Sequence, residues 1–88
     1  MDRSPKAIAE AIKEYVLSEF LPGADPAELT DSTPLITGRI LDSLGTLKLV
    51  AFIEARYGFE CEAHEADADH LDTISRIVTF VESKRAER

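Results

Sequence analysis

The feature that constrains the fold most is the boundary at Ser43. A segment rich in glycine and proline ends there, and a run with helical periodicity begins. The segment from Pro22 to Ile40 contains four residues that interrupt regular structure: Gly23, Pro26, Pro34 and Gly38. From Leu44 to Tyr57 the only glycine or proline is Gly45, and apolar residues recur at helical spacing. The sequence therefore predicts a long loop, then a helix over about 43–57.

Two further helices are predicted from their caps and their periodicity. Pro5 suits the first helical position after Ser4, whose hydroxyl can cap a helix over about 5–20. The apolar face of that helix comprises Ile8, Ala11, Ile12, Tyr15, Val16 and Phe20. A last helix over about 73–85 would be capped by Asp72 or Thr73. Its core face comprises Ile74, Ile77, Val78 and Val81.

A short helix is also expected over about 64–70, where Ala, Asp and Glu alternate with little apolar content. The predicted fold class is therefore all-α: a small four-helix bundle with a long loop between helices 1 and 2 and a short third helix. The 88 residues suffice for one domain, 1–88. The apolar residues of the long loop are expected to pack onto the bundle: Leu29, Leu35, Ile36 and Ile40.

The helix over 43–57 carries apolar residues on two faces. Leu49, Val50, Ile53 and Tyr57 cluster within one third of the circumference and are predicted core residues. Leu44, Leu47 and Ala51 cluster on a different face. Two interpretations remain open: the helix is packed on both sides, or this second face is an exposed strip that docks a partner.

Charge and composition exclude several classes of protein. The net charge of −7 argues against nucleic-acid binding, and no apolar run approaches the ~20 residues that span a bilayer. Met1 to Ala9 lack the apolar segment of a secretory signal. The single cysteine, Cys61, excludes an internal disulfide and fits a reducing, cytoplasmic setting with a packing role for its side chain.

The two histidines, His64 and His70, lack the spacing of a metal site or a nucleophile motif, so no metal is expected. They lie in a stretch whose carboxylates have no Lys or Arg among them: Glu60, Glu62, Glu65, Asp67, Asp69 and Asp72. This stretch is either a solvated face that aids solubility or a surface that steers basic partners.

The position of Ser43 at the start of a helix suits its hydroxyl to carrying a phosphate group. Backbone N–H groups without partners at a helix N-terminus, together with the helix dipole, favour a phosphate. The Ser43 hydroxyl can therefore carry a phosphodiester, while Asp42 caps the helix.

Asp42-Ser43-Leu44 and its flanks resemble the acyl carrier and peptidyl carrier proteins. The flanks that carry the resemblance are Asp31-Ser32-Thr33-Pro34-Leu35-Ile36 and Gly38-Arg39-Ile40 before the motif, and Leu49-Val50-Ala51-Phe52-Ile53-Glu54, Tyr57-Gly58-Phe59 and Leu71-Asp72-Thr73-Ile74 after it. The resemblance implies that Ser43 bears 4′-phosphopantetheine and that Asp42 helps a transferase to recognise the site.

The resemblance implies a carrier without catalytic activity of its own. A phosphopantetheinyl transferase would attach the arm, and an acyl- or aminoacyl-activating ligase would load its thiol with a thioester-linked group for a downstream transferase. Leu44, Leu47 and Ala51 would contact these partners. A cytoplasmic monomer that neither binds nucleic acid nor inserts into membranes is expected.

Two positions depart from the pattern of fatty-acid-synthesis carriers. Those proteins usually have an acidic residue directly after Asp-Ser-Leu and another three positions on, where this chain has Gly45 and Lys48. The segment from Asp42 to Thr46 is more similar to D-alanyl carrier proteins and other stand-alone aminoacyl or peptidyl carriers. The resemblance thus favours a discrete carrier that serves an adenylating ligase.

Two other functions remain as alternatives. One is a non-covalent protein-interaction module, a small acidic helical domain that binds through Leu44, Leu47 and Ala51. The other is a hydrolase that uses Ser43 as its nucleophile, although no motif places a general base beside it.

Overall fold

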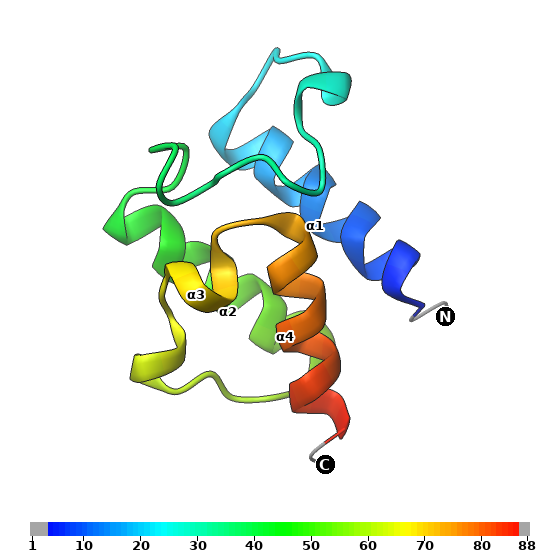
Figure 1. The fold of residues 1–88 in the computed structure, drawn as a ribbon, viewed down its shortest axis with the longest axis vertical. Helices are drawn as coiled ribbons and strands as arrows, with labels where there is room; N and C mark the ends of the chain where they lie inside the picture. Colours follow the sequence, from blue (N-terminus) through cyan, green and yellow to red (C-terminus); the bar gives the residue numbers. More distant parts are fainter. Residues whose placement is uncertain (1–3, 87–88) are drawn as a thin grey trace.

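The computed structural model describes residues 4–86; the remaining residues of the predicted domain, 1–3 and 87–88, lie outside the described part. The described chain forms helices and connecting loops (Figure 1). The elements in order are α1 (Pro5–Phe20), the 3₁₀ turn η1 (Pro26–Glu28), α2 (Ser43–Tyr57), the 3₁₀ turn η2 (Ala63–Glu65), α3 (Ala68–Leu71) and α4 (Ile74–Ala86). The all-α fold class is thereby confirmed.

The first two long helices, α1 and α2, have the bounds that the sequence predicts, because local caps define them. The Ser4 hydroxyl accepts a hydrogen bond from the Ala7 N–H at 3.2 Å, and Pro5 occupies the first helical position. Gly58 follows α2 in the left-handed conformation, with a φ of 72°, which ends the helix at little steric cost.

The third helix is not the continuous helix over 64–70 that the sequence analysis expects. It is split into η2 and α3, and Ala66 and Asp67 lie between them. Asp67 has an extended backbone and its carboxylate accepts the His70 N–H, so it starts a new helix. Glu62 and Glu65 cap η2 reciprocally. The Asp67 carboxylate thus takes an N–H group that a continuous helix would donate to a carbonyl of its own, and so divides the segment.

The last helix begins one residue later than predicted and ends one residue later, at Ala86. Of the two candidate caps, Thr73 is the one that caps, since its hydroxyl accepts the Arg76 N–H at 3.1 Å. Asp72 is turned towards the long loop instead. Differences of one residue at a helix end carry no functional meaning.

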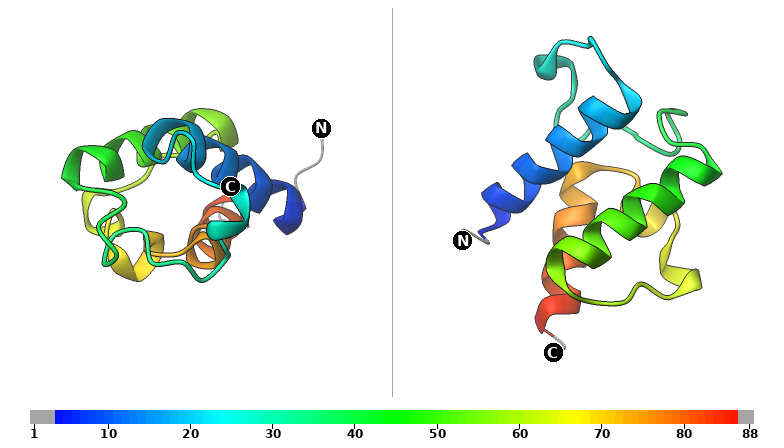
Figure 2. Two further views of the ribbon diagram at one scale, coloured as in Figure 1. Left: turned by 90° about the horizontal axis from the view of Figure 1, so that it is seen from above. Right: turned by 180° about the vertical axis from the view of Figure 1, so that it is seen from behind.

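The core lies between α4 and the helices that pack on it, α1 and α3, with α2 crossing behind (Figures 1 and 2). All predicted core residues of α2 and α4 are buried, and so are Leu29 and Leu35 of the long loop. Ile36 and Ile40 pack against the core from its edge. Leu41, which the sequence analysis does not place in the core, is also buried. Within residues 4–86, no helix has the length and apolar character needed to cross a membrane.

Asp72 fastens the long loop to the start of α4. Asp72 is a buried residue, with 8% of its surface exposed. Its carboxylate accepts hydrogen bonds from the N–H groups of Ile36 and Thr37, each at 2.9 Å, and from the Thr37 hydroxyl at 2.9 Å. The Asp72 carbonyl accepts the Leu35 N–H at 2.6 Å. The loop that leads to Ser43 is therefore held against the bundle by one buried side chain and its backbone.

Candidate functional site

Ser43 is the first residue of α2, and its side chain is exposed. Asp42 precedes it as the N-cap, with its Oδ1 atom accepting the Gly45 N–H at 2.6 Å. Among residues 4–86, the N–H groups of Ser43 and Leu44 have no hydrogen-bond partner. The serine hydroxyl thus lies beside two available donors at the positive end of a helix of 15 residues, which favours an anion there.

A largely apolar groove of about 570 Å³ opens beside Ser43. One wall is the start of α2 and the loop before it; the other is the segment around η2. Its lining is Ile36, Leu41, Asp42, Ser43, Thr46, Leu47, Ala63, Ala66 and Asp67. The sequence analysis did not find this groove, because residues from three separate stretches line it and no local pattern records their meeting.

The second apolar face of α2 is exposed, which rules out the interpretation in which this helix is packed on both sides. Leu44 and Leu47 are each 61% exposed, and Ala51 is exposed. Among residues 4–86 these leucines are the only large apolar side chains that lie so open. Ala55, which the sequence analysis did not single out, lies on the same face. We call Leu44, Leu47, Ala51 and Ala55 the exposed strip.

Gly45, one of the two departures from fatty-acid-synthesis carriers, faces inward. A Cβ atom at this position would lie 3.0 Å from Cε1 of Phe20 and 3.1 Å from Oδ1 of Asp42. These separations are shorter than ordinary van der Waals contact, so the Phe20 ring would have to shift by a few tenths of an ångström to admit a side chain. The acidic residue that fatty-acid-synthesis carriers have at this position would therefore be crowded here.

We expect Gly45→Glu to lower the free energy of unfolding by about 1–3 kcal/mol, the usual range for overpacking. Removing a glycine from a helix would by itself stabilise α2 by up to about 1 kcal/mol, so the steric effect must exceed that gain. Urea denaturation checks the prediction. The matched control is Lys48→Glu, which places the same carboxylate on an exposed position of α2 and is expected to change stability little. Equal free energies of unfolding for Gly45→Glu and Lys48→Glu would contradict the prediction.

Neither histidine forms a hydrogen bond with Ser43. Nδ1 of His64 lies 3.5 Å from a Glu62 carboxylate oxygen, and Nδ1 of His70 lies 2.7 Å from Oδ1 of Asp67. The His70 side chain, which hydrogen-bonds Asp67, holds the pKa of the Asp67 carboxyl below its ordinary value. No base therefore activates the Ser43 hydroxyl within the described residues, and the geometry does not support the hydrolase alternative.

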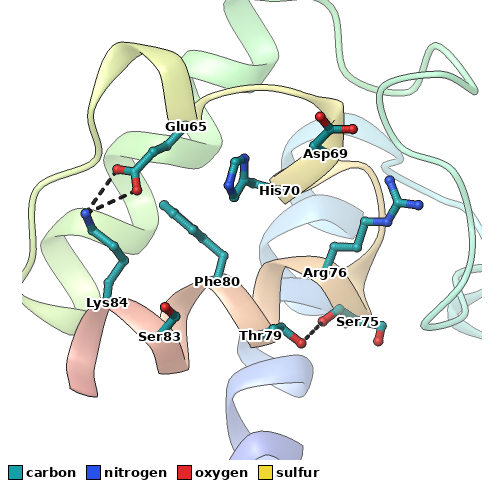
Figure 3. A pocket seen from close by; sticks show the side chains of 9 residues that line it. All are labelled: Glu65, Asp69, His70, Ser75, Arg76, Thr79, Phe80, Ser83 and Lys84. Atoms are coloured by element: carbon teal, nitrogen blue, oxygen red, sulfur yellow. Dashed lines mark hydrogen bonds and ion pairs between the residues drawn. The ribbon is translucent and has the colours of Figure 1, made fainter. Parts of the chain in front are cut away.

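His70 lines a second cavity, of about 310 Å³, between the η2–α3 segment and α4. Figure 3 shows Phe80 pointing from α4 towards the space between Glu65 and His70, with the Glu65–Lys84 ion pair at one end. The Nζ–Oε1 distance of that pair is 3.0 Å. In residues 4–86 no three His, Cys, Asp or Glu side chains gather as metal ligands would. The Glu65–Lys84 ion pair beside this cavity joins the η2–α3 segment to α4.

Cys61 lies at the edge of the core, half-buried, and its N–H donates to Glu54 at 2.6 Å. Burial, and after it the carboxylates of Glu65 and Glu54, raises the pKa of the thiol to about 11. A thiol with that pKa is a poor nucleophile near neutral pH, which agrees with a packing role.

No family profile matches the chain as a whole or in part. Individual proteins do match it. A D-alanyl carrier protein of Lacticaseibacillus casei is 33% identical over 75 residues, which cover 83% of this chain and 93% of the relative. A D-alanyl carrier protein of Lacticaseibacillus rhamnosus is 32% identical over 75 residues, with the same coverage. An acyl carrier protein of Chlamydia felis is 28% identical over 81 residues, which cover 92% of this chain and 99% of the relative.

Proposed function

Because this chain belongs to the carrier protein family that includes the D-alanyl and acyl carrier proteins, we propose that it carries an acyl or aminoacyl group on a 4′-phosphopantetheine arm attached to Ser43. The observation that supports this most is the exposed Ser43 hydroxyl at the N-terminus of α2, beside an apolar groove. The protein's role is to present the group, and partner enzymes perform the chemistry.

The residues around Ser43 fit the proposed arm. The phosphodiester would lie beside the N–H groups of Ser43 and Leu44, where the helix dipole favours negative charge. The groove supplies apolar surface beside the attachment point, and it has room for a flexible chain. Bound in this way, the arm supplies a terminal thiol that holds its cargo as an activated thioester. Asp42 would preserve the helix start that presents the hydroxyl.

The partners follow from the same proposal. A phosphopantetheinyl transferase would modify Ser43, an adenylating ligase would load the thiol, and a downstream transferase would remove the cargo. Leu44, Leu47 and Ala51 would contact these enzymes through the exposed strip. The replacement of two acidic positions by Gly45 and Lys48 supports a discrete aminoacyl or acyl carrier over a fatty-acid-synthesis carrier. We propose that it acts as a monomer in the cytoplasm.

The first test is intact mass spectrometry of the purified chain after incubation with coenzyme A and a broad-specificity phosphopantetheinyl transferase. We expect a gain of one phosphopantetheinyl group per chain. Protein purified from its native cells should carry a further mass that neutral hydroxylamine removes, because hydroxylamine cleaves thioesters. The released hydroxamate would identify the cargo as aminoacyl or acyl.

An unchanged mass, with a transferase that modifies a known carrier in the same mixture, would contradict the proposal. The non-covalent interaction module would then be the better interpretation. That alternative also uses the exposed strip, but it requires no modification of Ser43.

A further inference from the structure

Two cationic side chains lie along one edge of the exposed strip. Arg39, in the loop before α2, and Lys48, one helical turn after Leu44, line the same shallow depression. Both are exposed, and neither forms an ion pair with any residue in 4–86. The depression borders the Ser43 groove, because Asp42 lines both of them, but Arg39 and Lys48 line only the depression and Ser43 lines only the groove. Both cations are therefore available to a partner that covers the exposed strip.

Two of the carboxylates close to the strip are held by backbone hydrogen bonds, although they keep their negative charge. Asp42 binds the Gly45 N–H, and Glu54, at the opposite edge of the strip, accepts the Cys61 N–H at 2.6 Å. Only Glu19, at the end of α1, adds an uncommitted carboxylate to the depression. In the depression Arg39 and Lys48 balance the charges of Glu19 and Asp42, so this face is less negative than the chain as a whole, whose net charge is −7.

We propose that the exposed strip docks protein partners that present carboxylates beside an apolar pocket, and that Arg39 and Lys48 bind those carboxylates. This inference rests on the proposed carrier function and specifies the chemistry of its partners. Opposite charges bordering an apolar contact contribute orientation and selectivity, and like charges there exclude wrong partners. Enzymes with a basic docking surface, suited to carriers with an acidic α2, would be repelled by Lys48.

The overall negative charge does not oppose this proposal, because screening limits its reach. At physiological ionic strength the Debye length is about 8 Å, so charges at the contact outweigh those on distant faces. A membrane surface is a less suitable occupant. Each cation near an anionic bilayer contributes only about 1 kcal/mol, and two of them would have to bring a strongly acidic chain to a negative surface.

The test uses the purified full chain without its arm, labelled with ¹⁵N, and two synthetic amphipathic helical peptides as probes. The peptides share one leucine face, which glutamates flank in one and lysines in the other. We expect the glutamate peptide to shift the amide signals of Leu44, Leu47 and Ala51. Its affinity at this strip should be about fivefold higher than that of the lysine peptide, a modest advantage typical of exposed ion pairs. Added salt should reduce the difference.

Charge reversal provides the decisive comparison. Arg39→Glu combined with Lys48→Glu should invert the preference at the strip. Arg56→Glu is the matched control, because Arg56 lies on α2 near the Phe52 ring, away from the strip, and should leave the preference unchanged. Equal affinities, a preference for the lysine peptide, or no shift at the strip with either peptide would overturn the proposal. So would binding to phosphatidylserine vesicles that the double variant loses.

The outcome is independent of cofactor attachment, since neither probe needs the arm. A preference for glutamate in a chain that a transferase cannot modify would leave the docking proposal standing and refute the carrier function. A modified chain without that preference would refute only the docking proposal.

Discussion

Replacing Ser43 with alanine is expected to abolish attachment of the phosphopantetheine arm completely. The proposed bond joins the arm's phosphorus to the Ser43 oxygen, and alanine has no atom that could replace that oxygen. The fold should persist, because Asp42 and not Ser43 supplies the N-cap hydrogen bond of α2. We expect the free energy of unfolding to change by less than about 0.5 kcal/mol. Intact mass after incubation with transferase and coenzyme A, and urea denaturation, measure the two effects.

Ser4→Ala is the matched control for that variant, since Ser4 is also a serine at the start of a long helix. It should gain the arm as the parent protein does, while losing about 1 kcal/mol of stability through its lost cap. A mass gain in Ser43→Ala would show that another residue is modified and would refute the assignment of Ser43. If neither Ser43→Ala nor Ser4→Ala gained mass, the transferase reaction itself would have failed.

Replacing Asp72 with alanine is expected to destabilise the fold by about 3 kcal/mol, the largest stability effect predicted for a polar residue here. The change removes the acceptor of the Ile36 and Thr37 N–H groups and of the Thr37 hydroxyl. The loop before Ser43 would also lose its attachment to α4. Urea denaturation should therefore show a lower midpoint, and hydrogen exchange should show faster exchange in the loop.

Asp69→Ala is the control, because Asp69 is an exposed carboxylate in the same segment. Its stability should stay within about 0.5 kcal/mol of the parent protein. An effect of Asp72→Ala as small as this would show that the observed hydrogen bonds do not hold the loop.

The effect of Asp72 should depend on pH in a defined direction. Burial raises the pKa of the Asp72 carboxyl, but hydrogen bonds from Thr37 and Ile36 and the charge of Arg76 lower it by more, so that the pKa lies below its ordinary value. A carboxyl whose pKa is lowered by folding stabilises the protein above its unfolded pKa, and this contribution is lost as the pH falls through the folded pKa. The gap between the parent protein and Asp72→Ala should thus be full at pH 7 and shrink below about pH 4.

Those features of the fold that depend on neighbouring residues were predictable from the sequence. The bounds of α1 and α2 follow from Ser4, Pro5, Asp42 and Gly58, each of which acts on its own helix end. The prediction of one continuous helix over 64–70 was wrong, because it did not foresee the break at Ala66 and Asp67. In the structure the Asp67 carboxylate binds the His70 N–H and starts a new helix, a competition that composition does not reveal.

By itself the sequence determined that this chain forms helices, where the long ones begin and end, and that Ser43 stands at the start of one of them. These properties are local, since caps and periodicity act over a few residues. Only the tertiary structure decided that Leu44 and Leu47 are exposed, that Phe20 packs closely against Gly45, and that Asp72 holds the loop before Ser43. The groove likewise exists because residues distant in sequence are brought together by packing, and the spacing within any one helix does not encode that meeting.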